Sequence, residues 1–156
     1  GLNIHTFQEL SDVINKIHDS GIEVIANYLF GLPGDNIESM QKTLDLSLEL
    51  CTSAWNAYPA MPLPGSSLYK QAVGKGYTLP MTYDGYSFHS ENTLPLPTEY
   101  LIPAEILKFR DEAFHIYHTN KDFLNRVERK LGETAVKSIL EMNKIKLKRK
   151  IVGEIK

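Results

Sequence analysis

The fold is decided by the stretch from Ile22 to Asp35, which reads IEVIANYLFGLPGD. Its first nine residues are almost continuously apolar, which is typical of a strand that is buried on both faces and pairs in parallel. A glycine loop, Gly31–Gly34, follows at once, and Asp35 with Glu38 has the pattern of a helix N-terminus. A strand, a glycine loop and a helix in this order predict an α/β fold.

The expected elements extend in both directions from this stretch. Upstream, Thr6 and Glu9 form a capping-box pattern that begins a helix over residues 6–20. Downstream, a helix to about residue 50 leads to a second strand over residues 53–60, where Trp55 and Tyr58 favour extended backbone. One helix joins the two strands, so we expect them to be parallel, with both following loops at the same carboxyl edge.

The second half of the chain predicts a loop followed by helices. Ser66 is expected to cap a short helix to about residue 73. Residues 76–100 have no sustained periodicity, but their aromatic residues favour an ordered loop over a flexible linker. Helices are expected over 103–118, over 121–131 and from 133 onward. A basic run at residues 144–150 then ends the pattern, and we expect its lysines to form a solvated face.

The composition excludes several classes of protein. The 156 residues are 42% hydrophobic and 23% charged, which indicates one globular domain rather than a disordered, collagen-like or membrane-spanning chain. A net charge of −2 gives no reason to expect nucleic acid or a membrane as a partner. No signal-peptide pattern is present, and the single cysteine, Cys51, suits a reducing compartment, so we expect a cytoplasmic protein.

The two glycine-containing loops are the candidate ligand site. In Gly31–Gly34 the backbone can approach a ligand closely, and the following helix directs its positive dipole end there. The second loop, residues 61–66, is expected beside it, and two irregular loops at one carboxyl edge suit a ligand hollow. Neither the phosphate-binding lysine motif nor the dinucleotide fingerprint is present. A tight turn without a ligand is the alternative interpretation of the first loop.

Other polar residues give weaker signals. His115 and His118 are three apart on a helix, but no further ligand accompanies them, so we expect half-exposed helix residues and no metal site. His89 lies near Asp84 and Glu91, which suits either a substrate-facing cluster or, as we favour, packing within the loop. Cys51 is expected to be a small buried apolar residue.

The order of these pieces resembles the carboxyl-terminal half of a radical S-adenosylmethionine enzyme, in the large group with an N-terminal cobalamin-binding domain. The resemblance lies in residues 21–35, in residues 58–69 and in residues 109–114 with Tyr117. It implies a partial (β/α) barrel with parallel strands over residues 1–76. The loop and helical extension of residues 77–156 then pack on this barrel. In this comparison the two strands are similar to the fifth and sixth barrel strands, and Asp35 stands where glutamate is more usual.

The same resemblance implies what the parent enzyme uses. Its cofactors are a four-iron four-sulfur cluster, S-adenosylmethionine and cobalamin, and it acts on a small-molecule substrate as an oxidoreductase or methyltransferase. The family holds its cluster with three cysteines, whereas this sequence has Cys51 alone. We therefore expect an inactive fragment with no catalytic residue and no cofactor of its own. Its partner is the missing amino-terminal half, and in its absence the fragment is expected to self-associate.

Strand alternation completes the candidate site. Asn27 and Leu29 share one face of the first strand and are expected to point into the barrel, although a hydrogen bond to the neighbouring strand also accounts for Asn27. From the second strand, either Ala57 and Pro59 or Asn56 and Tyr58 face the same hollow. The residues expected to bind the cofactor are Asn27, Leu29, Gly31, Leu32, Pro33, Gly34, Tyr58 and Pro59. The competing interpretation is a self-contained, non-enzymatic α/β module that binds a nucleotide or a protein.

Overall fold

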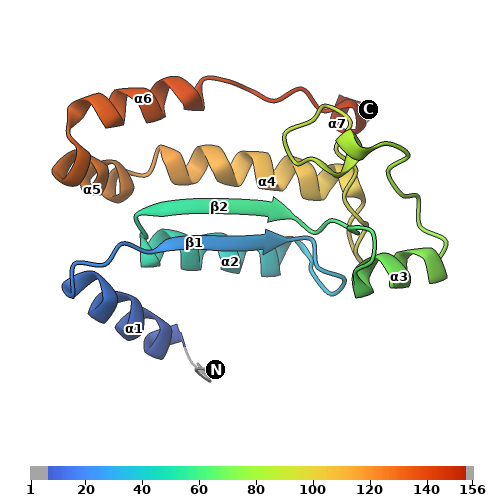
Figure 1. Cartoon of the computed structure of the whole chain (residues 1–156), viewed down its shortest axis with the longest axis horizontal. Coiled ribbons are helices and arrows are strands. Elements are labelled where there is room, and N and C mark those ends of the chain that lie inside the picture. Colours follow the sequence, from blue (N-terminus) through green and yellow to red (C-terminus); the bar gives the residue numbers. More distant parts are fainter. Residues whose placement is uncertain (1–6, 154–156) are drawn as a thin grey trace.

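Two parallel strands, β1 (Ile25–Phe30) and β2 (Ala54–Pro59), form the centre of the computed structural model, which describes residues 7–153 (Figure 1). The helices of this part of the chain are α1 (Phe7–Asp19), α2 (Ile37–Leu50), α3 (Ser67–Gly74), α4 (Pro103–His118), α5 (Lys121–Leu131), α6 (Glu133–Asn143) and α7 (Lys150–Gly153), with a short 3-10 helix, η1 (Tyr83–Tyr86). The chain is therefore mixed α/β and mostly helical.

The two strands are neighbours joined through α2. Ile25 lies beside Ala54 and Phe30 beside Pro59, which confirms the predicted parallel pairing. Both loops that follow the strands therefore lie at the same carboxyl edge, as expected. Within the described residues the sheet has these two strands alone, so the outer edge of β1 is not paired.

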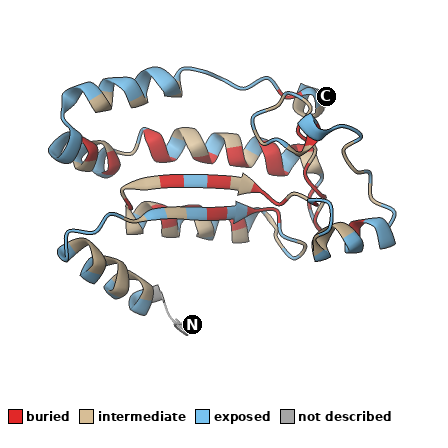
Figure 2. Cartoon of the chain, viewed as in Figure 1, coloured by how far each residue is buried: buried red, intermediate tan, exposed pale blue. Residues whose placement is uncertain are grey.

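The two faces of the sheet have different environments (Figure 2). One face is packed against α2 and α4 and carries Tyr28, Phe30, Trp55 and Ala57, all buried. We call the other the open face; its residues are Ile25, Asn27, Leu29, Ala54, Asn56 and Tyr58. Leu29 is 50% exposed, so the prediction of a strand buried on both faces is wrong: helices cover only one side of β1.

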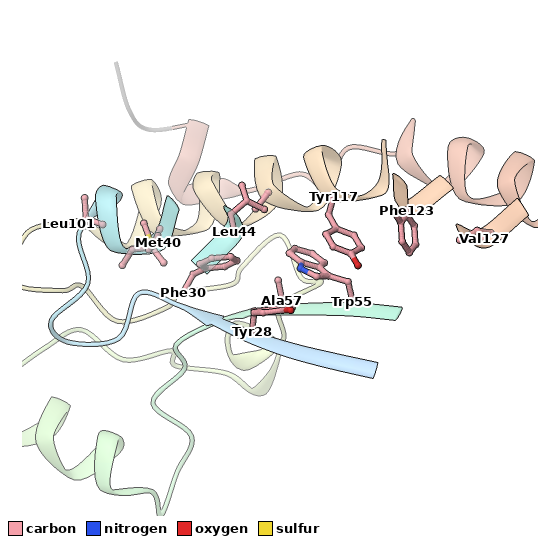
Figure 3. Close-up of a cluster of buried hydrophobic side chains, with 12 residues drawn as sticks. Tyr28, Phe30, Met40, Leu44, Trp55, Ala57, Leu101, Tyr117, Phe123 and Val127 are labelled. Atoms are coloured by element: carbon pink, nitrogen blue, oxygen red, sulfur yellow. The ribbon is translucent and has the colours of Figure 1, made fainter. Parts of the chain in front are cut away.

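Aromatic side chains from distant segments form the core (Figure 3). The Trp55 ring stacks on Tyr117 of α4 with 5.0 Å between ring centroids, and Phe30 meets Phe109 edge to face at 5.3 Å. Phe123 extends this cluster into α5. Such pairs add about 0.5–1.5 kcal/mol each beyond the burial of their area, so α4 is fixed firmly over both strands.

Most predicted helix boundaries are confirmed, but the start of α2 differs. The side chain of Asn36 accepts a hydrogen bond from the Ser39 amide, and the Ser39 hydroxyl accepts one from the Asn36 amide. This reciprocal cap replaces the expected one by Asp35 and Glu38, because Asp35 is turned back toward its own loop. Ser66 caps α3 as predicted, and Thr6 of the first expected cap lies outside the described residues.

Residues 76–100, which we call the aromatic loop, are attached to the rest of the chain by main-chain hydrogen bonds. The Leu96 amide donates to Ala60, and the Glu99 amide donates to Pro33. The C-terminal segment packs against this loop through Arg149, which is buried although the basic run was predicted to be solvated. The lysines of that run are exposed, as expected. In residues 7–153 there is no helix with the length and apolar character needed to cross a membrane.

Candidate functional site

A hollow of about 360 Å³ lies at the carboxyl ends of both strands. Three segments contribute to it: the ends of β1 and β2, the proline-rich loop after β2, and the aromatic loop. The lining residues are Leu29, Tyr58, Pro59, Met61, Leu63, Tyr86 and Phe88. We call this feature the aromatic hollow. In sheets of parallel strands, ligands bind at this end, outside the carboxyl ends of the strands.

The lining of the aromatic hollow suits a flat, largely apolar group. The Tyr58 and Phe88 rings meet edge to face with centroids 4.9 Å apart, and Met61 supplies a polarisable side chain beside them. Tyr58 and Tyr86 each carry a hydroxyl group in addition to an apolar ring. A few polar groups in an apolar pocket orient a ligand and provide specificity.

A pair of asparagines lies next to the hollow on the open face. Asn27 and Asn56 are paired in the strand register, one step before Leu29 and Tyr58 on the same face. The Asn56 side-chain nitrogen donates to the Asn27 side-chain oxygen across 3.1 Å. This bond to the neighbouring strand is the alternative foreseen for Asn27. It leaves the Asn27 amide nitrogen and the Asn56 amide oxygen able to bond a ligand or water.

The structure resolves the choice between the two residue sets of the second strand. Asn27 and Leu29 share the open face with Asn56 and Tyr58, whereas Ala57 belongs to the buried face. Pro59 also belongs to that buried set, yet it still lines the hollow at the end of β2.

The first glycine loop makes its hydrogen bonds within the chain. The Asp35 carboxylate accepts from the Gly31 amide at 3.0 Å and from the Leu32 amide at 2.9 Å, and it also accepts from the Ser39 hydroxyl. These are the two amides that an anionic ligand of this loop would need. The carboxylate occupies the position of such a ligand.

Gly31 is required by packing against α4. Its φ of +79° lies in the left-handed region, and a Cβ atom on it would stand 2.5 Å from Cγ2 of the buried Ile106. None of residues 31–34 is among the described residues that line the aromatic hollow. The expectation that both loops border one hollow is therefore correct only for the second loop, which contributes Met61 and Leu63.

Two residues of the hollow, Tyr86 and Phe88, were missed as site residues. They belong to the aromatic loop, where the sequence favoured packing. The signal that identifies them is the concentration of aromatic residues in a long loop without periodicity, since loops of this kind are usually functional or disordered.

A second hollow, of about 430 Å³, lies at the opposite end of the sheet. There Glu23 accepts hydrogen bonds from Ser53, Arg126 and Lys130, which ties the start of both strands to α5. In sheets of parallel strands, ligands bind at the carboxyl ends of the strands, and this cluster lies at the amino ends. We therefore interpret this cluster as a structural link between the sheet and α5.

The two histidines of α4 each bond to another residue of the chain. His115 is bonded through Nδ1 to Asn143, while His118 is bonded through Nδ1 to the Phe114 carbonyl. His118 is buried, not half-exposed as expected, and burial lowers its pKa. Among residues 7–153, no group of three or more His, Cys, Asp or Glu side chains is placed to hold a metal ion.

The three polar residues of the aromatic loop that the sequence singled out, His89, Asp84 and Glu91, are all exposed. Asp84 accepts hydrogen bonds from Thr82 and Asn92, which lower its pKa. Glu91 pairs with Lys150, and the His89 ring lies 4.1 Å from that of Phe88. The three side chains His89, Asp84 and Glu91 thus have separate partners.

Cys51 lies at the other end of the sheet from the aromatic hollow, in the turn before β2. It ends α2 with a left-handed φ of 42° and is half-buried, and this burial raises the pKa of its thiol. A thiol with a raised pKa forms little thiolate near neutral pH, which is the form that binds metals.

Neither a scan against protein-family models nor a search of the curated proteins finds a match for this chain.

Proposed function

We propose that this chain is the carboxyl-terminal part of the barrel of a radical S-adenosylmethionine enzyme, in the group that also carries a cobalamin-binding domain. In this proposal β1 and β2 are neighbouring strands of a partial (β/α) barrel, with their open face turned to its interior. The chain lines the adenosine side and the substrate side of the site. The remaining strands and the cluster ligands come from the amino-terminal half of the parent enzyme.

The observation that carries the proposal is the place of the aromatic hollow. It lies at the carboxyl ends of two parallel strands and includes Leu29 and Tyr58 of the open face, the face that helices leave exposed. Barrel strands have one face toward a helical layer and one toward the interior, and active sites lie at their carboxyl ends. Both properties support the barrel interpretation over a sheet covered on both sides.

The groups that such an enzyme uses fit this chain to different degrees. An adenosyl group fits, because its flat base suits Tyr58 and Phe88 and its polar edge suits Asn27 and Asn56. A four-iron four-sulfur cluster does not fit, because it needs several thiolates and the sequence has Cys51 alone. No feature of residues 7–153 selects cobalamin, so no role for it is derived.

In the parent enzyme, bound S-adenosylmethionine supplies the radical chemistry, and the residues of this chain bind and orient it. Tyr58 and Phe88 hold the base by ring contacts, while Leu29 and Met61 exclude water from its apolar faces. The free amide groups of Asn27 and Asn56 bond the polar edge and fix its orientation.

Adenosine is the probe that tests this function in the chain as it exists. The sequence contains four methionines, so labelling their methyl carbons with ¹³C gives four NMR signals. Met61 lines the hollow, Met40 lies in the core, and Met81 is 99% exposed. We expect adenosine to shift the Met61 signal in a saturable manner and to leave the signals of Met40 and Met81 unchanged.

Two variants sharpen this titration. Tyr58→Ala removes a wall of the hollow and is expected to weaken adenosine binding at least about fivefold, in line with the 1–3 kcal/mol measured for stacking of a base on an aromatic ring. Tyr83→Ala, a tyrosine of η1 that is 92% exposed, is the matched control and is expected to leave binding unchanged. Adenosine that moves no methyl signal, or moves that of Met142 instead, contradicts the proposal.

The fragment part of the proposal has its own tests. We expect the gene to encode a three-cysteine motif upstream in the same reading frame, whereas a natural start at α1 supports the self-contained binding module. We also expect the purified chain, supplied anaerobically with iron and sulfide, to assemble no stable cluster, because one thiolate cannot replace three. Stoichiometric binding of four irons would refute this.

A further inference from the structure

One buried arginine attaches the aromatic wall of the hollow to the C-terminal segment. The Arg149 side chain is 3% exposed and donates to three acceptors of the aromatic loop. Nη2 donates to the Phe88 carbonyl at 2.8 Å, and Nη1 donates to the Ser90 carbonyl at 2.8 Å and to the Thr93 hydroxyl at 2.9 Å. These bonds hold the main chain of the segment that carries Phe88.

The other side of the same guanidinium binds α4. Nε of Arg149 donates to Oδ2 of Asp111 at 2.7 Å, and Nη2 donates to Oδ1 at 2.9 Å. This is a two-point arginine–carboxylate pair, which combines charge with a fixed geometry. A lysine has one charged nitrogen and cannot make this planar arrangement, so the position requires arginine.

A second arginine, Arg110, contacts the ring of Phe88, the residue whose main-chain carbonyl binds Arg149. Arg110 also donates to Asp111, at 3.0 Å, and its Nε donates to the Ala57 carbonyl of β2 at 2.8 Å. Its guanidinium lies over the Phe88 ring, 5.6 Å from the centroid. Phe88 thus has three contacts: its carbonyl binds Arg149, its ring lies under the Arg110 guanidinium, and its ring meets that of Tyr58 edge to face.

The remaining attachment between the two segments is at the surface. The Lys150 amide donates to the Glu91 carbonyl at 3.0 Å, and the two side chains pair at 3.4 Å. Both of these side chains are more than half exposed, and exposed pairs of this kind contribute little to stability. The buried contacts of Arg149 are therefore the stronger of these two attachments between the C-terminal segment and the loop.

We propose that Arg149 is a positioning residue for the aromatic hollow: it fixes Phe88 against Tyr58, so that the hollow grips a flat ligand only when the C-terminal segment is in place. The bond from Arg149 to the Phe88 carbonyl joins residues 61 positions apart in the chain. Removal of Arg149 leaves Phe88 with its ring contacts but without its main-chain anchor. The ligand part of this inference rests on the proposed function, whereas the placement of Phe88 does not.

The experiment compares three variants by methionine-methyl NMR. Arg149→Gln removes the charge and the two-point pair, Arg149→Lys keeps the charge only, and Lys148→Gln is the matched control at an exposed neighbour. In Arg149→Gln we expect the ligand-free Met61 signal to shift, since Met61 and Phe88 line the same hollow, while the Met40 signal of the core stays in place. The Leu94 amide, bonded to the Gly85 carbonyl, should exchange faster with solvent.

Ligand binding is measured on the same samples with adenosine. We expect Arg149→Gln to weaken adenosine binding at least fivefold, Arg149→Lys to weaken it less, and Lys148→Gln to leave it unchanged. An Arg149→Gln protein whose Met40 signal is native, and whose Met61 signal and Leu94 exchange are also native, overturns the proposal. Should Arg149→Gln fail to fold, the Met61 signal and Leu94 exchange of Arg149→Lys decide in the same way.

The outcomes separate this inference from the proposed function. If adenosine does not bind the unaltered chain, the adenosyl site is wrong, and the ligand-free Met61 signal still tests whether Arg149 positions Phe88. If adenosine binds equally well to Arg149→Gln and to the unaltered chain, the site stands and the positioning role is wrong.

Discussion

The hydroxyl of Tyr117 donates a hydrogen bond to the main-chain carbonyl of Thr52, 3.1 Å away, and so joins α4 to the start of β2. Tyr28, on the same buried face, has a buried hydroxyl without a hydrogen-bond partner among the described residues. Burial raises the pKa of Tyr28 to about 12 and raises that of Tyr117 as well, so both hydroxyls stay protonated at neutral pH. The core thus contains two buried tyrosines, of which Tyr117 has a hydrogen bond for its hydroxyl and Tyr28 has none among the described residues.

Replacing each tyrosine by phenylalanine measures that bond. Tyr117→Phe leaves the buried Thr52 carbonyl unpaired and is expected to lower the free energy of unfolding by about 1–2 kcal/mol. Tyr28→Phe removes an unpaired hydroxyl and is expected to leave stability unchanged or slightly higher. Urea unfolding followed by Trp55 fluorescence, the single tryptophan, reports both. Equal losses in the two variants would contradict the assigned bond.

The contact between Gly31 and Ile106 predicts a strong effect of one methyl group. Gly31→Ala adds a Cβ 2.5 Å from the Ile106 side chain at a φ of +79°, and we expect it to lower the free energy of unfolding by roughly 2–4 kcal/mol. Gly34→Ala is the control, because no atom lies within 4 Å of its added Cβ. If both variants unfold at the same urea concentration, Gly31 is not required by packing.

The Asp35 carboxylate predicts an anion site that can be opened. Asp35→Ala frees the Gly31 and Leu32 amides and is expected to lower the free energy of unfolding by about 1–3 kcal/mol. Because free main-chain amides in a loop that leads into a helix N-terminus can bind an anion, sulfate should raise the melting temperature of this variant more than that of the unaltered chain. Asp45→Asn, on the exposed side of α2, should show neither effect.

Protonation of His118 is expected to destabilise the fold at acidic pH. Burial holds its folded pKa below the ordinary value of 6.5, so on acidification the unfolded chain takes up a proton before the folded chain does. The free energy of unfolding therefore falls as the pH decreases below about 6.5, by up to about 1.4 kcal/mol per pH unit for this one group. His118→Gln should flatten this slope between pH 7 and pH 5, while His115→Gln should retain it. Parallel slopes in all three proteins would show that His118 does not contribute.

The unpaired edge of β1 and the open face predict self-association of the chain. Ile25 is 61% exposed in a strand whose outer edge has no partner among the described residues, and such edges pair with other chains. Light scattering should show a mass that rises with concentration, and Ile25→Lys should reduce it. Ile22→Lys, at an equally exposed position outside the strand, is the control. A chain that stays monomeric at high concentration would count against the fragment proposal as well.

Local signals in the sequence predicted most of the elements. The proline at position 103 and the glycine at position 132 mark the start of α4 and the end of α5, and the structure places both boundaries there. The parallel pairing also followed, because one helix between two strands leaves little choice of topology. Each of these features depends on residues close together in the chain.

Three features of the structure could not be predicted from the sequence. Asp35 suits a helix cap and a loop carboxylate equally well in sequence, and the backbone angles of the turn decide between them. Arg149 stands among exposed lysines, and nothing near it shows that Asp111, 38 residues earlier, will pair with it. The exposure of the open face of β1 could not be predicted either, because an apolar run does not show whether one or both faces of the strand are covered.

The position of α4 over both strands has a consequence for the synthesis of the chain. Its last residue, His118, follows the end of β2 by about 60 residues, which a ribosome adds in roughly 3–12 s at 5–20 residues per second. Throughout that interval Phe30, Trp55 and Ala57 have no α4 to cover them. The nascent chain is therefore exposed to aggregation and to chaperone binding until translation has passed α4.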